Sequence, residues 1–249
     1  MILLQILLAT TLVSLISVIG ILLFAVKRNV QGLTFYLISL ASGTMLGGAF
    51  LHLLPEAAEY NLPNLFLLIA IGVFIFFIFE KFLIWRHCHT HEHTHGREAS
   101  RPAAASMMLA ADSVHNFIDG IIIASAFLSS TPLGVTVTLA ILLHEIPQEL
   151  GDSAVLMHAG FSLKKILLAN ALTALTAILG GVLTYFFLSK VPLVQPYLLA
   201  LTAGGFLYIA LADLIPQLHE QVTLKHTVIQ IVLLGGGFMT MFLLKSLAH

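Results

Sequence analysis

Short polar breaks divide the chain into eight long apolar runs. A transmembrane helix needs about 20 mostly apolar residues, and each run reaches about that length. Lipid cannot satisfy exposed backbone N–H and C=O groups, so segments that cross it must be helical. The pattern therefore predicts an all-α integral membrane protein, with one domain over residues 1–249 and eight transmembrane helices. The predicted spans lie at about residues 2–26, 33–55, 64–85, 103–128, 133–158, 164–188, 194–216 and 227–247.

Composition supports the same class of protein. The 249 residues are 59% apolar and 9% charged, whereas soluble domains contain about 25% charged residues. The formal net charge of −1 indicates no nucleic-acid partner, and the single cysteine, Cys88, excludes an intrachain disulfide. The first apolar run is longer than the roughly 7–15 residues of a signal-peptide core and has no basic stretch before it, so we interpret it as a retained helix.

The basic residues predict the orientation in the membrane, because Lys and Arg accumulate in cytoplasmic loops. With the N-terminus outside, the outer side receives only Lys190 and Lys245. Both termini are then outside, and the segment 86–101 is a cytoplasmic loop. The cytoplasmic side receives Lys27, Arg28, Lys81, Arg86, Arg97, Arg101, Lys164, Lys165 and Lys225.

Polar residues concentrate in the fourth and fifth predicted helices. His115 and Asp119 are four residues apart, so they share a helix face at a separation of about 6 Å, and His144 and Gln148 repeat this spacing. If the two helices face each other, their imidazole, carboxylate and amide groups lie at the same depth in the membrane. Imidazole and carboxylate suit zinc and other first-row divalent ions. The predicted metal ligands are His115, Asn116, Asp119, His144, Glu145 and Gln148.

The same helices also carry Asp112, Glu149 and Asp152. A charge at the bilayer centre costs about 2.5–3.5 kcal/mol, so these carboxylates require a cation, protons or a water-filled cavity. A polar cluster that only joins helices and a proton relay without metal are the alternatives. Two histidines and several acids within two turns favour metal, and Glu149 is a further candidate ligand.

A zinc-enzyme interpretation comes from the string HEIPQ at residues 144–148, which is close to the H-E-x-x-H pattern of metalloproteases. In that pattern both histidines bind zinc and the glutamate is the base. Here Gln148 replaces the second histidine, and Pro147 interrupts the helix that would present the pair. A membrane-embedded metalloprotease therefore stays an alternative to the non-enzymatic interpretation.

A second metal-binding tract lies between the third and fourth predicted helices. Histidine alternates with other residues through this short segment, which offers many donors without a fixed geometry. A cytoplasmic tract of this kind would receive metal that leaves the membrane or would sense it. Its histidines are His87, His89, His91, His93 and His95.

These strings resemble those of a known family. Residues 115–120 (HNFIDG) and 144–152 (HEIPQELGD) are similar to the two signature strings of the ZIP family of metal-ion transporters, the second particularly to its LIV-1 branch. Residues 52–56 (HLLPE) and 213–216 (DLIP) resemble the ends of the family's second and seventh helices.

The resemblance implies a transporter and not an enzyme. It implies an eight-helix bundle of two inverted three-helix repeats around a central helix pair, with both termini outside. The family moves zinc, and often Fe²⁺, Mn²⁺ or Cd²⁺, into the cytoplasm, and its members often form homodimers. By the same resemblance the first metal position is held by His52, His115, Asp119, His144 and Gln148, and the second by Asn116 and Glu145.

Gln148 departs from the family pattern, which usually has His or Glu there. Because its amide is neutral, we expect lower zinc affinity or a changed metal selectivity. A metal exporter of the diffusion-facilitator kind is the remaining alternative, but that class usually has six helices. The small size favours a prokaryotic inner or plasma membrane.

Overall fold

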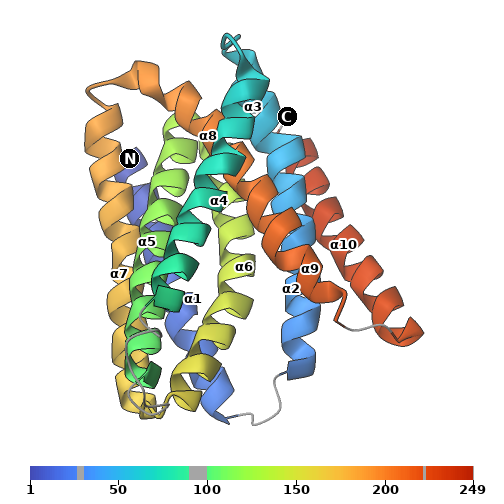
Figure 1. Ribbon diagram of the computed structural model, residues 1–249. Helices are drawn as coiled ribbons and strands as arrows, with labels where there is room; N and C mark the ends of the chain where they lie inside the picture. Colours follow the sequence, from blue (N-terminus) through green and yellow to red (C-terminus); the bar gives the residue numbers. More distant parts are fainter. Residues whose placement is uncertain (27–30, 90–99, 221–222, 249) are drawn as a thin grey trace.

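The computed structural model describes residues 1–26, 31–89, 100–220 and 223–248 (Figure 1). Within these ranges every regular element is a helix and none is a strand. The elements are α1 (Ile2–Val26), α2 (Gln31–Gly47), η1 (Gly48–Leu53), α3 (Leu54–Glu59), α4 (Leu65–His89), α5 (Ser100–Ser129), α6 (Thr131–His158), α7 (Leu163–Leu188), η2 (Pro192–Val194), α8 (Gln195–Tyr208), η3 (Ile209–Leu214), α9 (Ile215–Leu218) and α10 (Leu224–Ala248).

The surface of the bundle is apolar and its interior carries polar groups. On α7, Leu168 and Leu172 are 61% and 59% exposed, whereas Asn170 between them is fully buried. This is the reverse of a soluble protein, where large apolar side chains are mostly inside. The arrangement suits a multi-pass membrane protein, in which lipid contacts the leucines and polar groups face the bundle interior.

Among the described side chains, four helical stretches are both long and apolar enough to cross a membrane: Leu33–Glu59, Leu163–Leu188, Pro192–Leu218 and Leu224–Ser246. α5 and α6 are also long, but their buried acidic residues include Asp112, Asp119, Glu145 and Glu149. These two helices therefore depend on neighbouring helices to shield their polar groups from lipid.

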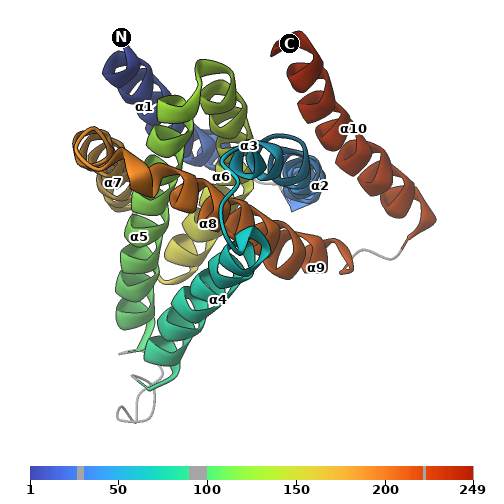
Figure 2. The same ribbon diagram turned by 90° about the horizontal axis from the view of Figure 1, so that it is seen from above.

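α5 and α6 are adjacent in the chain and pack against each other within the bundle. α5 also packs along α7, and α1 contacts both α6 and α7. On the other side α2 pairs with α10. There α4 also pairs with α8 (Figure 2). The first residues of α1 and the last residues of α10 lie toward the same end of the bundle (Figure 1).

Close contact between α5 and α7 depends on glycine. A Cβ added at Gly120 would overlap the carbonyl of Ala177, and one added at Gly180 would overlap the carbonyl of Phe117. Small residues let membrane helices approach to backbone contact. The two glycines therefore set how closely α7 covers the polar side of α5.

Two segments widen into π-helices, η1 between α2 and α3 and η3 between α8 and α9. In both cases the next helix has proline as its second residue, Pro55 in α3 and Pro216 in α9. Proline has no N–H to donate to the backbone hydrogen bonds of a regular α-helix. A π-helical turn accommodates the resulting shift in which backbone N–H and C=O groups are paired. His52 and Asp213 are each the fifth residue of their π-helix.

Candidate metal site

The candidate metal site lies between α5 and α6. His115 and Asp119 come from one face of α5, as their spacing predicts, and His144 and Glu145 come from α6. One ligand atom from each of these four residues lies within 4.8 Å of the other three. Asp119, His144 and Glu145 are buried, and His115 is partly exposed. We refer to these four residues as the α5–α6 cluster.

The distances within the α5–α6 cluster match those of a small coordination sphere. His115 Nε2 lies 3.2 Å from Glu145 Oε1 and 3.5 Å from Asp119 Oδ2. His144 Nε2 lies 3.7 Å from Glu145 Oε1 and 3.8 Å from Asp119 Oδ2. Four ligand atoms around tetrahedral zinc, with bonds of about 2.0–2.1 Å, lie about 3.3–3.4 Å apart. The donor atoms are thus nearly at the spacing of a zinc site.

Local hydrogen bonding orients His144. Its Nδ1 lies 3.3 Å from the Ala140 carbonyl one turn earlier in α6, and a carbonyl can only accept a hydrogen bond. The ring proton therefore sits on Nδ1, and the lone pair of Nε2 faces the cluster. Histidine ligands are commonly oriented in this way by a partner on the other ring nitrogen.

Asp119 provides an electrostatic reason for a cation here. Its side chain is about 2% exposed, and its Oδ2 has no hydrogen-bond partner among the described residues. Together with Glu145 it places two carboxylates in an interior where ions are costly. A divalent cation would neutralise both and would satisfy the lone pairs of both imidazoles.

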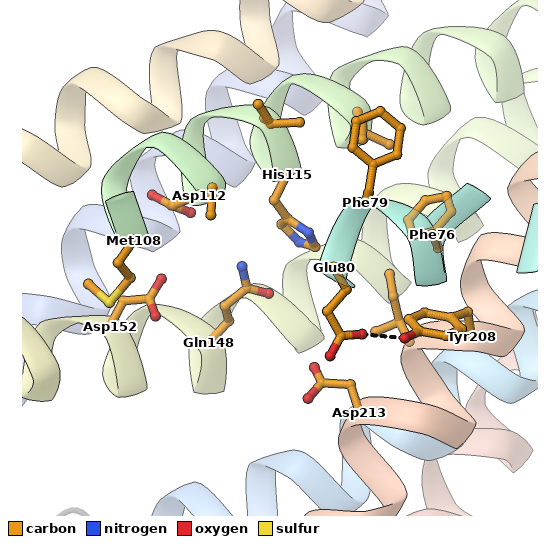
Figure 3. A pocket seen from close by; sticks show the side chains of 14 residues that line it. Phe76, Phe79, Glu80, Met108, Asp112, His115, Gln148, Asp152, Tyr208 and Asp213 are labelled. Carbon is orange, nitrogen blue, oxygen red and sulfur yellow. Dashed lines mark hydrogen bonds between the residues drawn. The ribbon is translucent and has the colours of Figure 1, made fainter. Parts of the chain in front are cut away.

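A cavity of about 300 Å³ reaches the α5–α6 cluster at His115. The His115 side chain is 22% exposed, whereas those of its three partners are at most 2% exposed. Gln148 lines the same cavity, between His115 and Asp152 (Figure 3). The cavity therefore reaches the one member of the cluster that is partly exposed, and Gln148 forms part of its wall.

Asn116 is fully buried beside the cluster. Its amide donates to the Asp112 carboxylate at 2.8 Å, and its Oδ1 has no hydrogen-bond partner in the described part of the chain. It is not among the four residues with converging ligand atoms. The unpartnered oxygen remains available to a second metal position, so this expectation stays a prediction.

His52 lies apart from the α5–α6 cluster. Its Nε2 is 2.9 Å from the Met241 carbonyl of α10, and it lines a different cavity, of about 260 Å³, with Glu56, Glu59 and Lys245. That cavity also contacts Ser130, between α5 and α6, so it lies at the end of the bundle that holds both chain termini (Figure 1). The predicted ligand from the second span is thus not brought to the other ligands in this structure.

Glu149 is directed toward α7, where its carboxylate accepts a hydrogen bond from Asn170 at 2.8 Å. His87 and His89 fall in the last turn of α4, whose side chains are outside the described part. His91, His93 and His95 also lie outside the described residues. The prediction of a histidine-rich metal tract therefore stays a prediction.

The spacing of residues in the sequence did not identify several polar residues that lie near the site. Tyr208 of α8 donates to the Glu80 carboxylate of α4, and both line the cavity with Asp213 (Figure 3). Asn170 is a single polar residue within an apolar run, and Glu80 with Lys81 interrupts another. Such interruptions are the one sequence feature that could have pointed to Glu80 and Asn170.

Comparison with known proteins identifies the group to which the chain is related. The family described as ZIP Zinc transporter matches residues 2–103 and 85–245. Zinc transporter ZIP13 of Pongo abelii is 34% identical over 223 residues, which cover 83% of this chain and 65% of that protein. Zinc transporter YKE4 of Saccharomyces cerevisiae is 31% identical over 247 residues, covering 84% and 70%.

Zinc transporter ZIP6 of Homo sapiens is 38% identical over 140 residues, which cover 54% of this chain and 18% of that protein. The chain thus spans less than two thirds of the length of the ZIP13 and ZIP6 relatives. The family match nevertheless extends over most of its residues and includes α5 and α6. The chain belongs to the ZIP zinc transporter family.

Proposed function

We propose that the protein transports divalent metal ions, most directly zinc, across a membrane into the cytoplasm through the α5–α6 cluster. The observation that carries this proposal is the convergence of His115, Asp119, His144 and Glu145 within 4.8 Å between two helices. A mixed nitrogen and carboxylate set at this spacing suits zinc, and Fe²⁺, Mn²⁺ and Cd²⁺ are expected to compete with it. The zinc-transporter names of the relatives support the same cargo.

The two cavities support a path through the protein. One contains His52 at the end of the bundle that holds the termini, and the other contains Gln148 and extends toward Asp152, further along α6. We propose that metal enters past His52, passes the α5–α6 cluster and leaves past Gln148. In this scheme His52 and Gln148 are ligands at successive stages of one path, and Asn116 supports a second metal position beside the cluster.

We also propose eight membrane spans, arranged as two inverted repeats around α5 and α6. The support comes from matching features of the half before α5 (α1–α4) and the half after α6 (α7–α10). Each half contains a π-helix that is followed by a proline, and the fifth residue of each π-helix is polar, His52 in η1 and Asp213 in η3. A Cβ added at Gly43 of α2 would overlap α10, and one added at Gly204 of α8 would overlap α4. The pairing of α2 with α10 is thus repeated by the pairing of α8 with α4.

The proposed direction rests on the distribution of basic residues. By the spans predicted from the sequence, nine of the eleven Lys and Arg residues fall on the side opposite the chain termini, which the positive-inside rule makes cytoplasmic. Metal leaving past Gln148 would then meet the histidine-rich segment between α4 and α5. That segment is proposed as a cytoplasmic acceptor.

The metalloprotease alternative is disfavoured by the position of Glu145. In an H-E-x-x-H enzyme the glutamate activates a water and is not itself a ligand. Here Glu145 Oε1 is one of the converging atoms, 3.2 Å from His115 Nε2. Gln148, at the position of the second histidine, lines the cavity instead of joining the four.

Uptake of zinc into proteoliposomes that contain a trapped zinc-sensitive dye tests the proposal. His115→Ala and Asp119→Ala are expected to abolish most of the uptake, because each removes a ligand from the path. His226→Ala, on α10 and away from both cavities, is the matched control and should transport like the parent. Parental rates in both cluster variants would exclude the α5–α6 cluster as the transport site.

A further inference from the structure

A second buried polar group lies on the side of α6 that faces α7. It consists of Glu149 and Ser153 of α6 and Asn170 of α7, and all three side chains are fully buried. Gln148 and Glu149 are neighbours in the chain, but successive residues of a helix point about 100° apart. Gln148 therefore faces the cavity, whereas Glu149 faces α7.

Asn170 holds this group together. Its Nδ2 donates to Glu149 Oε2 at 2.8 Å and lies 3.4 Å from Ser153 Oγ. Its Oδ1 is buried and has no hydrogen-bond partner among the described residues. A buried carboxylate beside an unsatisfied buried amide oxygen is an environment that favours a cation.

We propose that Glu149, Ser153 and Asn170 form a second cation site, separate from the α5–α6 cluster, which takes a hard divalent cation such as Mn²⁺. The donors are a carboxylate, a hydroxyl and an amide oxygen, with no imidazole or thiolate. Oxygen-only donor sets suit Mn²⁺, Mg²⁺ and Ca²⁺ better than they suit zinc. The α5–α6 cluster, with two imidazoles, has the opposite preference.

The geometry allows this site to form without moving a helix. Rotating the Asn170 amide by half a turn exchanges Oδ1 with Nδ2 and places Oδ1 near Glu149 Oε2 and Ser153 Oγ. Separations of 2.8 and 3.4 Å are close to the spacing of ligand oxygens around an ion with bonds of about 2.1–2.6 Å. The amide can therefore donate to Glu149 or act as a ligand beside it.

Asp152 precedes Ser153 in α6 and lines the same cavity as Gln148, whereas Glu149, Ser153 and Asn170 are not among the residues that line it. The proposed site is therefore enclosed between α6 and α7. A cation held there would change which ions the protein retains, independently of whether the α5–α6 cluster transports zinc.

Counting bound Mn²⁺ by electron paramagnetic resonance in the purified protein tests this site without a transport assay. The double variant His115→Ala/His144→Ala weakens the α5–α6 cluster and is expected to keep one Mn²⁺ per chain. Adding Glu149→Gln to this background should weaken that binding by about 10- to 100-fold, the range seen when groups that support a metal are removed. Adding Ser189→Ala, at the end of α7, is the control and should leave binding unchanged.

Asn170→Asp provides a second measurement that does not depend on loss of binding. It places two carboxylates together in the interior, so its unfolding temperature should fall in EDTA and recover on addition of Mn²⁺ more than that of the parent. Any one of three results would overturn the proposal. The His115→Ala/His144→Ala protein could bind no Mn²⁺, or adding Glu149→Gln could leave its Mn²⁺ binding unchanged. The third such result is an Asn170→Asp protein that Mn²⁺ does not stabilise. None of these outcomes depends on zinc uptake.

Discussion

Nε2 of His115 on α5 lies 3.2 Å from Nε2 of His144 on α6, and the two rings are nearly perpendicular, at 83°. With the His144 proton on Nδ1, His115 Nε2–H can donate a hydrogen bond to His144 Nε2 and so join the two helices without metal. A cation bound to both nitrogens would replace this hydrogen bond and hold the same two helices together. Substitutions at these residues should therefore affect metal binding more than the fold.

His144→Ala should weaken zinc binding to the purified protein by more than about tenfold, since even outer-shell partners of a metal contribute about 10- to 100-fold. His144 is both a ligand and the residue whose orientation Ala140 sets. Zinc affinity can be measured by competition with a fluorescent chelator. His226→Ala serves as the control, and equal affinities in the two variants would show that His144 is not a ligand.

Gln148→His should shift metal preference toward zinc and away from Mn²⁺. The substitution adds an imidazole to the wall of the cavity that reaches His115, and imidazole favours zinc. The ratio of zinc to Mn²⁺ uptake by proteoliposomes is the measurement. Gln195→His, at the start of α8 and outside this cavity, is the matched control. If the uptake ratio is the same in both variants, Gln148 does not influence selectivity.

Gly120→Ala should destabilise the protein by about 1–3 kcal/mol, the usual cost of overpacking. A Cβ at this position would overlap the Ala177 carbonyl and separate α5 from α7. Gly235→Ala on α10 is the control, because a Cβ added there has nothing within 4 Å. Thermal unfolding in detergent compares the two. Equal unfolding temperatures would mean that α5 and α7 are not in backbone contact.

Cys88 should react with a membrane-impermeant maleimide only from the cytoplasmic side. It lies in the last turn of α4, the end that the basic residues predict to be cytoplasmic. Labelling should occur in inside-out vesicles and be absent in right-side-out vesicles. The reverse pattern is expected for Lys190→Cys in a Cys88→Ser background. Labelling of Cys88 from outside would invert the proposed topology and the direction of transport.

The positions of many elements could be predicted from the sequence, because lipid imposes long apolar helices separated by polar breaks. The run expected at about 164–188 is α7, Leu163–Leu188. The pairing of His115 with Asp119 on one face also follows from helical periodicity, which is a property of the chain alone. The HNFIDG and HEIPQELGD strings correctly indicated the ZIP family.

Periodicity does not specify how far one helix is rotated against the next, and this rotation decides which polar groups meet. Tertiary packing brings Glu145 Oε1 to His115 Nε2, turns Glu149 toward Asn170 and places His52 against Met241 in a separate cavity. These contacts depend on close helix approaches, such as that at Gly120, between segments far apart in the chain. The sequence by itself determined the helices, the family and the chemical nature of the ligands. Only the tertiary structure decided which of them share a site, because that depends on side-chain packing across helix interfaces.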